Sequence, residues 1–292
     1  MRRITVFVLF AVAFCAALWG SPANASGTYY RPGAFAIGSY TGIGAGEYRI
    51  GARLDFQHFS RVRNFEGGSM EVGDVRLRTY SLTAERGLTD RSSVYVVLPF
   101  VDNDSATNAD PFKKESGLGD IKLGYNQLLS GEAGSGRSWL GTLEVTIPGR
   151  NYSTKKLTAP GDNSVDFVGH VSYRNNSLFG GPLFYTVGAG FKLRASQSPD
   201  QLLWDGELGG RFGNTLSVSG FIDSINSMHG LGLGGPGFAG DFAQLKQTVT
   251  RLGGRVIFNV GALEGQLYYA KAIQFQNQAP FDNYGLSVTG HF

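Results

Sequence analysis

The amino-acid sequence predicts an all-β fold, an antiparallel up-and-down β-barrel of about 12 strands. Three observations predict it. Apolar and polar residues alternate with period two along most of the chain, as they do in strands. Glycine accounts for 43 of 292 residues, which excludes a coiled coil and favours many turns. Cys15 is the only cysteine, so no disulfide can close the fold, whereas a barrel leaves no free sheet edge.

The N-terminus has the pattern of a secretory signal peptide. Two arginines precede an apolar run over residues 4–19, and residues 23–25 read Ala-Asn-Ala, a small-x-small cleavage site. We expect cleavage after Ala25; an uncleaved anchor is the alternative. Cleavage removes two of the 26 basic residues and none of the 23 acidic ones. The remaining net charge of +1 gives no sign of nucleic acid binding.

Segments in which apolar and polar residues alternate predict the individual strands in order along the chain. In the first, Ile50, Ala52 and Leu54 alternate with polar residues and glycine; in the seventh, Leu183 and Tyr185 do the same. Short connections between the strands, such as Gly213-Asn214, alternate with long connections along the chain. The expected strands are 49–60, 71–86, 91–102, 117–129, 138–149, 164–177, 182–194, 202–212, 215–226, 246–259, 263–275 and 284–292.

The length of these segments indicates a membrane rather than a soluble sandwich. Strands in soluble proteins run about 5–6 residues, whereas a tilted strand needs about 9–11 residues to cross a bilayer. In a bilayer the apolar face meets lipid and the polar face lines the lumen. Bacterial outer-membrane barrels have an even strand number, short periplasmic turns and long extracellular loops. The sequence therefore predicts a transmembrane barrel of the bacterial outer-membrane type.

Three parts of the chain follow from this assignment. Residues 1–25 are the signal peptide, 26–48 form an N-terminal segment in the periplasm or the lumen, and 49–292 form the barrel. The last strand ends on an aromatic residue after apolar residues of one parity. This ending resembles the signal by which such barrels are recognised for insertion, so the barrel-assembly machinery is an expected partner. The residues concerned are Tyr284, Leu286, Val288 and Phe292.

Short motifs resemble the outer-membrane family named for the MetA pathway of phenol degradation. They are Gly87–Arg91 (GLTDR), Leu98–Phe100 (LPF), Gly117–Gly124 (GLGDIKLG) and Ile147–Gly149 (IPG), followed by a last strand that ends in Phe. The resemblance covers roughly residues 49–292. It implies a barrel that passes small hydrophobic or aromatic molecules.

The polar face of the predicted strands supplies candidate pore-lining residues. Rings of charged side chains select solutes in channels, so we expect a channel for passive diffusion. The family resemblance implies that its solutes are small and aromatic or hydrophobic. A non-transporting structural or adhesive barrel, its lumen plugged by paired charges, is the alternative. The candidates are Arg49, Arg53, Asp55, Asp120, Lys122, Glu144, Asp166, His170, Arg174, Lys192, Arg194, Asp205, Glu207, Arg211, Asp223, Arg251, Arg255 and Glu264.

Two details of this face bear on transport. Gly124, Gly188 and Gly190 leave room in the lumen, which favours an open pore. Arg251 and Arg255 lie on one face of one strand, and clustered arginines favour anions. A small aromatic acid fits both these arginines and the family resemblance, so it is the solute class that we expect.

The other sequence patterns do not predict a catalytic, metal or cofactor site. His170 and Ser172 share a strand face as a lipase pair would, but two ordinary lumen residues explain them better, so we expect no enzyme activity. The histidines lack metal-ligand spacing. Gly232–Gly237 matches a dinucleotide motif, yet Pro236 and the surrounding loop favour a flexible extracellular segment. No cofactor or metal is expected. Outer-membrane lipid and lipopolysaccharide are the expected surroundings.

Overall fold

The computed structural model describes residues 43–64, 66–105, 114–131, 136–155, 158–195 and 198–292. The predicted signal peptide and most of the N-terminal segment lie outside the described residues. The described ranges contain one short 3-10 helix, η1 (Phe242–Gln244), and thirteen strands. The strands are β1 (Tyr48–Arg63), β2 (Ser69–Thr89), β3 (Ser92–Ser105), β4 (Lys114–Leu118), β5 (Asp120–Ser130), β6 (Arg137–Pro148), β7 (Asp166–Leu178), β8 (Leu183–Arg194), β9 (Gln201–Phe212), β10 (Leu216–Ser227), β11 (Thr248–Val260), β12 (Leu263–Gln276) and β13 (Asp282–His291).

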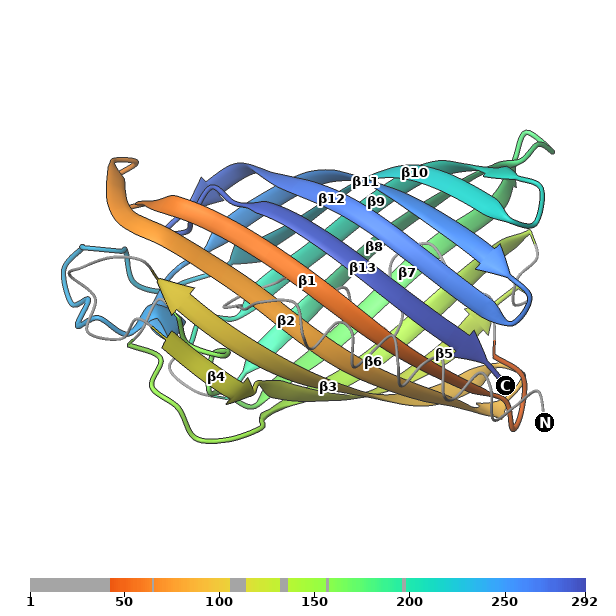
Figure 1. Cartoon of the computed structure of the whole chain (residues 1–292), viewed down its shortest axis with the longest axis horizontal. Helices are drawn as coiled ribbons and strands as arrows, with labels where there is room; N and C mark the ends of the chain where they lie inside the picture. Colours follow the sequence, from red (N-terminus) through yellow and green to blue (C-terminus); the bar gives the residue numbers. More distant parts are fainter. Residues whose placement is uncertain (1–42, 65, 106–113, 132–135, 156–157, 196–197) are drawn as a thin grey trace.

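These strands form one closed antiparallel barrel, as predicted. Neighbours in sequence are neighbours in the sheet, except that β4 and β5 both pair with β3. β1 pairs with both β2 and β13, so the first and last strands are joined. The strands are tilted steeply against the barrel axis (Figure 1). At the seam the backbone of Phe292 exchanges two hydrogen bonds with Tyr48, 2.9 and 3.0 Å long. Closure removes the sheet edges that would otherwise need a partner.

One predicted strand is divided in the structure. The segment 117–129 was expected to be continuous, but β4 and β5 are separate strands on either side of Gly119. Both pair with β3, β4 beside Phe100–Asp104 and β5 beside Ser92–Val97. Pro99 lies between these two pairings and has no N–H to donate. In the described part of the chain, β4 and β5 therefore fill one of twelve positions around the barrel.

The outer surface is apolar, as a lipid-facing surface should be. Leu143, Phe167 and Leu208 are among many large apolar side chains that point outward and are exposed. Trp139, Tyr173 and Tyr185 contact one another near the short turns, with ring centroids 5.0 and 5.8 Å apart. Aromatic girdles at this depth are typical of outer-membrane barrels. No helix within the described ranges is long and apolar enough to cross a membrane.

The two ends of the barrel differ. At the short-turn end, β2–β3, β7–β8, β9–β10 and β11–β12 are joined by turns of a few residues, and the C-terminus lies there (Figure 1). At the long-loop end lie the connections 149–165 and 228–247. Residues 43–47 also lie at the short-turn end, where Gly46 N–H donates to the carbonyl of Gly87. Their close approach leaves no room for a side chain at Gly87.

Candidate functional site

All eighteen candidate pore-lining residues lie on the inward face of the barrel. Most of them are buried, as Arg49, Glu144, Asp166 and Arg251 illustrate. The insertion residues lie on the opposite face, where Tyr284, Leu286 and Phe292 are exposed. The two sets of residues therefore lie on opposite faces of the barrel wall.

The charges on the inward face are paired along the wall. Lys122 on β5 lies 3.3 Å from Glu144 on β6, and Lys192 on β8 lies 2.6 Å from Asp166 on β7. His170 lies 2.8 Å from Asp205, two strands away. The alternative function assumed pairs that cross and fill the lumen. The ion pairs between described strand residues instead join strands at most two positions apart.

The two arginines that favoured anions belong to this paired wall. Arg251 donates two hydrogen bonds to Asp223, 2.8 and 2.9 Å long, and a third to Asn283. Arg255 lies 3.1 Å from Glu207 and over the ring of Phe221. Both arginines do share one face, as predicted. Because each faces a buried carboxylate, however, they no longer support a preference for anions.

Several residues of this wall were missed from the sequence. Glu85 pairs with Arg49. Tyr95 donates to Glu144 over 2.7 Å, and Tyr268 donates to Asp55. Glu85 lies on the polar parity of its strand, which was a usable signal. The two tyrosines gave none, because an aromatic residue in a membrane strand is usually assigned to lipid.

The inward-facing glycines serve packing and do not open the lumen, which corrects the prediction from Gly124, Gly188 and Gly190. A side chain at Gly124 would collide with the ring of Tyr95. At Gly188 and Gly190 it would meet His170. The space at each glycine is therefore filled by a large side chain from a neighbouring strand.

We expect Gly124→Ala to destabilise the barrel, because the methyl group displaces Tyr95 from Glu144. Overpacking of this kind costs about 1–3 kcal/mol. The measurement is the temperature at which the folded band shifts in gel electrophoresis. Gly220→Ala is the matched control, since the nearest atom to its added carbon is 3.8 Å away. Equal transition temperatures for the two variants would contradict this packing role.

Loop residues form an apolar cap that packs on inward-facing strand residues at the long-loop end. We use this name for Leu233, Phe238, Phe242 and Leu245 of the loop 228–247, with Ala279 and Phe281 of the loop 277–281, packed on inward-facing strand residues. Leu233, Leu245 and Phe281 are all buried. The segment Gly232–Gly237, expected to be a flexible extracellular loop, thus belongs to a loop that is folded into the mouth of the barrel. The strand residues beneath the cap are Phe59, Val62, Val75, Leu77, Val101, Val249 and Ala272.

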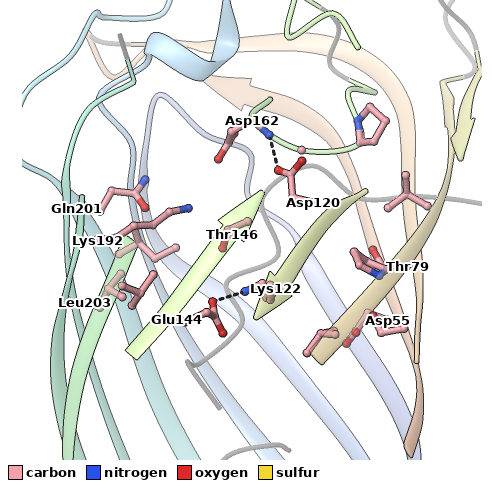
Figure 2. Close-up of a pocket in the computed structure, with 18 of the residues that line it drawn as sticks. Asp55, Thr79, Asp120, Lys122, Glu144, Thr146, Asp162, Lys192, Gln201 and Leu203 are labelled. Atoms are coloured by element: carbon pink, nitrogen blue, oxygen red, sulfur yellow. Dashed lines mark hydrogen bonds and ion pairs between the residues drawn. The ribbon is translucent and has the colours of Figure 1, made fainter. Parts of the chain in front are cut away.

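A cavity of about 160 Å³ lies next to the cap and the ion-paired wall (Figure 2). Lys192 and Gln201 line one side, and Asp55 and Thr79 the opposite side. Val168, Leu203, Ile225, Val249 and Phe281 supply an apolar part of the lining. The cavity therefore offers both apolar contact and polar groups to a small molecule.

The loop 149–165 reaches into this cavity and is fastened there. Tyr152 donates to Asp120, and the N–H of Asp162 donates to the same carboxylate over 3.1 Å. Burial, and then the charge of Asp120, raises the pKa of Tyr152, so its hydroxyl keeps its proton. Burial also disfavours the charged form of Asp162, yet Arg194 and Lys192 lower the pKa of this carboxyl overall. Both groups thus hold the loop in place near neutral pH.

The remaining patterns from the sequence do not form a reactive site. His170 Nε2 bonds to Asp205 over 2.8 Å. Among the described residues, no group of three or more His, Cys, Asp or Glu could hold a metal ion.

Comparisons with known proteins address the fold. The sequence matches no protein-family model and no curated protein. The structure is similar to the crystal structure of the COG4313 outer membrane channel from Pseudomonas putida F1, with a TM-score of 0.71, 15% identity, and coverage of 88% of this chain and 100% of that chain. The NanC porin is less similar, with a TM-score of 0.48, 8% identity, and coverage of 81% of this chain and 98% of that chain. The CymD monoaromatic hydrocarbon channel has a TM-score of 0.43, 10% identity, and coverage of 86% of this chain and 89% of that chain. The likeness to the COG4313 channel establishes the barrel fold.

Proposed function

We propose that the protein is an outer-membrane channel through which small one-ring amphipathic solutes diffuse passively. The observation that carries this proposal is the cavity beneath the apolar cap. An engineered protein cavity of about 150 Å³ holds benzene, so the 160 Å³ found here suits one aromatic ring. The solved barrel with a similar fold is named an outer membrane channel, which agrees with this role.

The lining of the cavity supports an amphipathic solute. A ring can rest on Val168, Leu203 and Ile225, while polar groups of the solute face the opposite wall. In two ion pairs the ammonium group is the more accessible partner. The side chain of Lys122 is 22% exposed and that of Glu144 1%, and Lys192 is 19% exposed against 2% for Asp166. Lys122 and Lys192 therefore present donor groups to the cavity; Glu144 lines it as well, whereas Asp166 does not.

The location follows from the same fold. The short-turn end faces the periplasm and the long-loop end faces outward, so a solute first meets the apolar cap. Lipid and lipopolysaccharide surround the barrel, and the barrel-assembly machinery inserts it through the exposed apolar face of β13.

A structural barrel without transport is the second candidate. The paired, buried charges of the wall and the cap over the mouth favour it. Planar bilayers and liposomes containing the purified full chain separate the two. We expect single-channel steps and faster uptake of phenylalanine, a one-ring amphipathic solute, than of sucrose. No steps and no uptake above protein-free liposomes would favour the structural barrel.

We further expect Val168→Phe to slow phenylalanine uptake severalfold, because the larger side chain fills the cavity that Val168 lines. Val187→Phe is the control, since Val187 points outward and is exposed. Uptake rates in liposomes measure the effect. The same rate for both variants would place the solute path elsewhere.

A further inference from the structure

A group of charged side chains lies on the outward, lipid-facing side of the barrel near the long-loop end. Thr79 on β2 and Val101 on β3 line the cavity inside the barrel, so Arg78 and Asp102, at the neighbouring positions, point outward. The sheet brings the other members of the group beside them, because β2, β3 and β4 lie next to one another (Figure 1). We call this group the outer charged cluster. It comprises Arg76, Arg78, Lys114, Asp74, Asp102 and Asp104.

The outer charged cluster occupies only one sector of the outer wall. Near the same end of β7, β8 and β9, the outward-facing side chains of Phe167, Leu193 and Leu202 are apolar, and each is about half exposed. A charged side chain on the lipid-facing side of a membrane barrel is unfavourable, and it is least so at the level of the lipid headgroups. The concentration of charge on β2–β4 therefore indicates polar lipid groups beside this sector.

Aromatic residues give the depth of the cluster in the membrane. Tyr80 on β2 lies opposite Phe100 on β3, and Phe56 on β1 lies opposite Arg78. Phe56 and Phe100 are both exposed on the outer wall. Aromatic girdles of outer-membrane barrels lie at the membrane–water interface. Arg78 is therefore level with the girdle, and Arg76 lies two residues farther toward the long loops, where the lipid headgroups begin.

Arg78 has a donor group that the described part of the chain does not use. The residue is 9% exposed, and its buried Nη1 has no hydrogen-bond partner among the residues that the structure describes. Asp102 lies opposite Arg78 in the sheet but forms its ion pair with Lys114, over 3.4 Å. Because a buried donor without a partner is costly, we expect Arg78 to bind an acceptor from outside the chain.

The charge balance of the cluster favours a lipid over a free ion. Its three cationic side chains are matched by three carboxylates, so no net positive charge attracts a free anion from water. A guanidinium group still binds a phosphate group bidentately. A lipid adds the contact of its acyl chains with Phe100, Leu82 and Leu98, which are exposed on the hydrocarbon side of Arg78. The ligand that suits this wall is therefore a phosphorylated lipid.

We propose that Arg78, together with Arg76 and Lys114, binds a phosphate group of lipopolysaccharide on the outer wall of the barrel. The lipid A part of this molecule carries phosphate in the headgroup region of the outer leaflet, which is level with the cluster when the long loops face outward. The bound lipid supplies the acceptor for Arg78 and lies outside the lumen. The proposal therefore does not depend on whether the barrel conducts.

Lipid-dependent stability tests the site. The purified full chain in detergent is heated with lipid A, with phosphatidylglycerol or with sodium phosphate at equal phosphate concentration, in EDTA so that divalent cations do not bridge the carboxylates. A ligand that binds the folded state raises the unfolding temperature, and we expect lipid A to raise it most. An equal rise with sodium phosphate would assign the site to a free anion, and an equal rise with phosphatidylglycerol would assign it to phospholipid. Either result, or no rise with lipid A, would overturn the proposal.

Variants locate the effect. We expect Arg78→Gln to require about tenfold more lipid A for the same rise, because it keeps a donor but loses the charge-assisted hydrogen bonds. Arg78→Lys should restore part of the response. Arg86→Gln is the matched control, because Arg86 is exposed on the same face of β2 near the short-turn end. If Arg78→Gln responds to lipid A as Arg86→Gln does, the proposal is wrong.

Lys114→Gln keeps the test decisive if Arg78→Gln does not fold. The side chain of Lys114 is 60% exposed, so we expect its replacement to leave the packing of the barrel unchanged. Gel mobility before and after boiling reports whether each variant is a folded barrel. We expect Lys114→Gln to require severalfold more lipid A than the unaltered protein. An unchanged requirement in this variant would contradict the proposal.

Discussion

Phe281→Ala should raise the fraction of time that single channels are open by about a hundredfold. Phe281 is buried in the apolar cap and also lines the cavity, so in the proposed channel it lies where a solute would move from the cap into the cavity. Removing a packed phenylalanine side chain costs about 3 kcal/mol or more, and every 1.4 kcal/mol changes an equilibrium about tenfold. The equilibrium constant that favours the closed cap over the open one therefore falls about a hundredfold.

Single-channel recordings in planar bilayers measure this open fraction. Ile273→Ala is the matched control, because Ile273 also lies near the long-loop end but points outward and is exposed. Gel mobility before and after boiling checks that both variants are folded barrels. Equal open fractions in the two variants would mean that the cap is a fixed part of the wall rather than a gate.

Asp223→Ala should lower the stability of the barrel by about 3–5 kcal/mol. It leaves the guanidinium of Arg251 buried without the carboxylate that accepts two of its hydrogen bonds. The temperature of the gel-mobility transition measures the loss. The exposed pair Arg61–Glu71 gives the contrast, and Glu71→Gln should cost less than about 1 kcal/mol.

Replacing both members of the buried pair separates charge from packing. Asp223→Leu combined with Arg251→Met removes the uncompensated charge, so we expect most of the stability to return. If the double variant is as unstable as Asp223→Ala, the residues matter for their shape or for Asn283, and not as an ion pair.

The sequence was sufficient to predict the barrel because alternation is a local signal. It placed every candidate residue, from Arg49 to Glu264, on the inward face. The ion pairs between those residues could not be predicted from the sequence, because they depend on the register between strands. Arg255 and Glu207, for example, meet across the intervening strand β10.

The wrong predictions arose at glycines, because a glycine is compatible with more than one local structure. Gly124 was taken as empty space, but glycine also makes room for a neighbour such as Tyr95. Gly119 divides a strand that the alternation alone presents as continuous. The segment 232–237 was interpreted from its glycines and Pro236 as part of a flexible extracellular loop. That interpretation did not indicate that Leu233 and Leu245 of the same loop pack on inward-facing strand residues.

The seam between β1 and β13 also determines the order in which this molecule can be built. Arg49 pairs with His291, so the contacts that close the barrel join almost the two ends of the described chain. Contacts between distant residues form slowly, because a long loop must close before they form. Hairpins such as β11–β12 can form locally, but the barrel is closed only when β13 pairs with β1. Closure of the barrel therefore depends on the pairing of β13 with β1, whose residues are among the most distant in the described sequence.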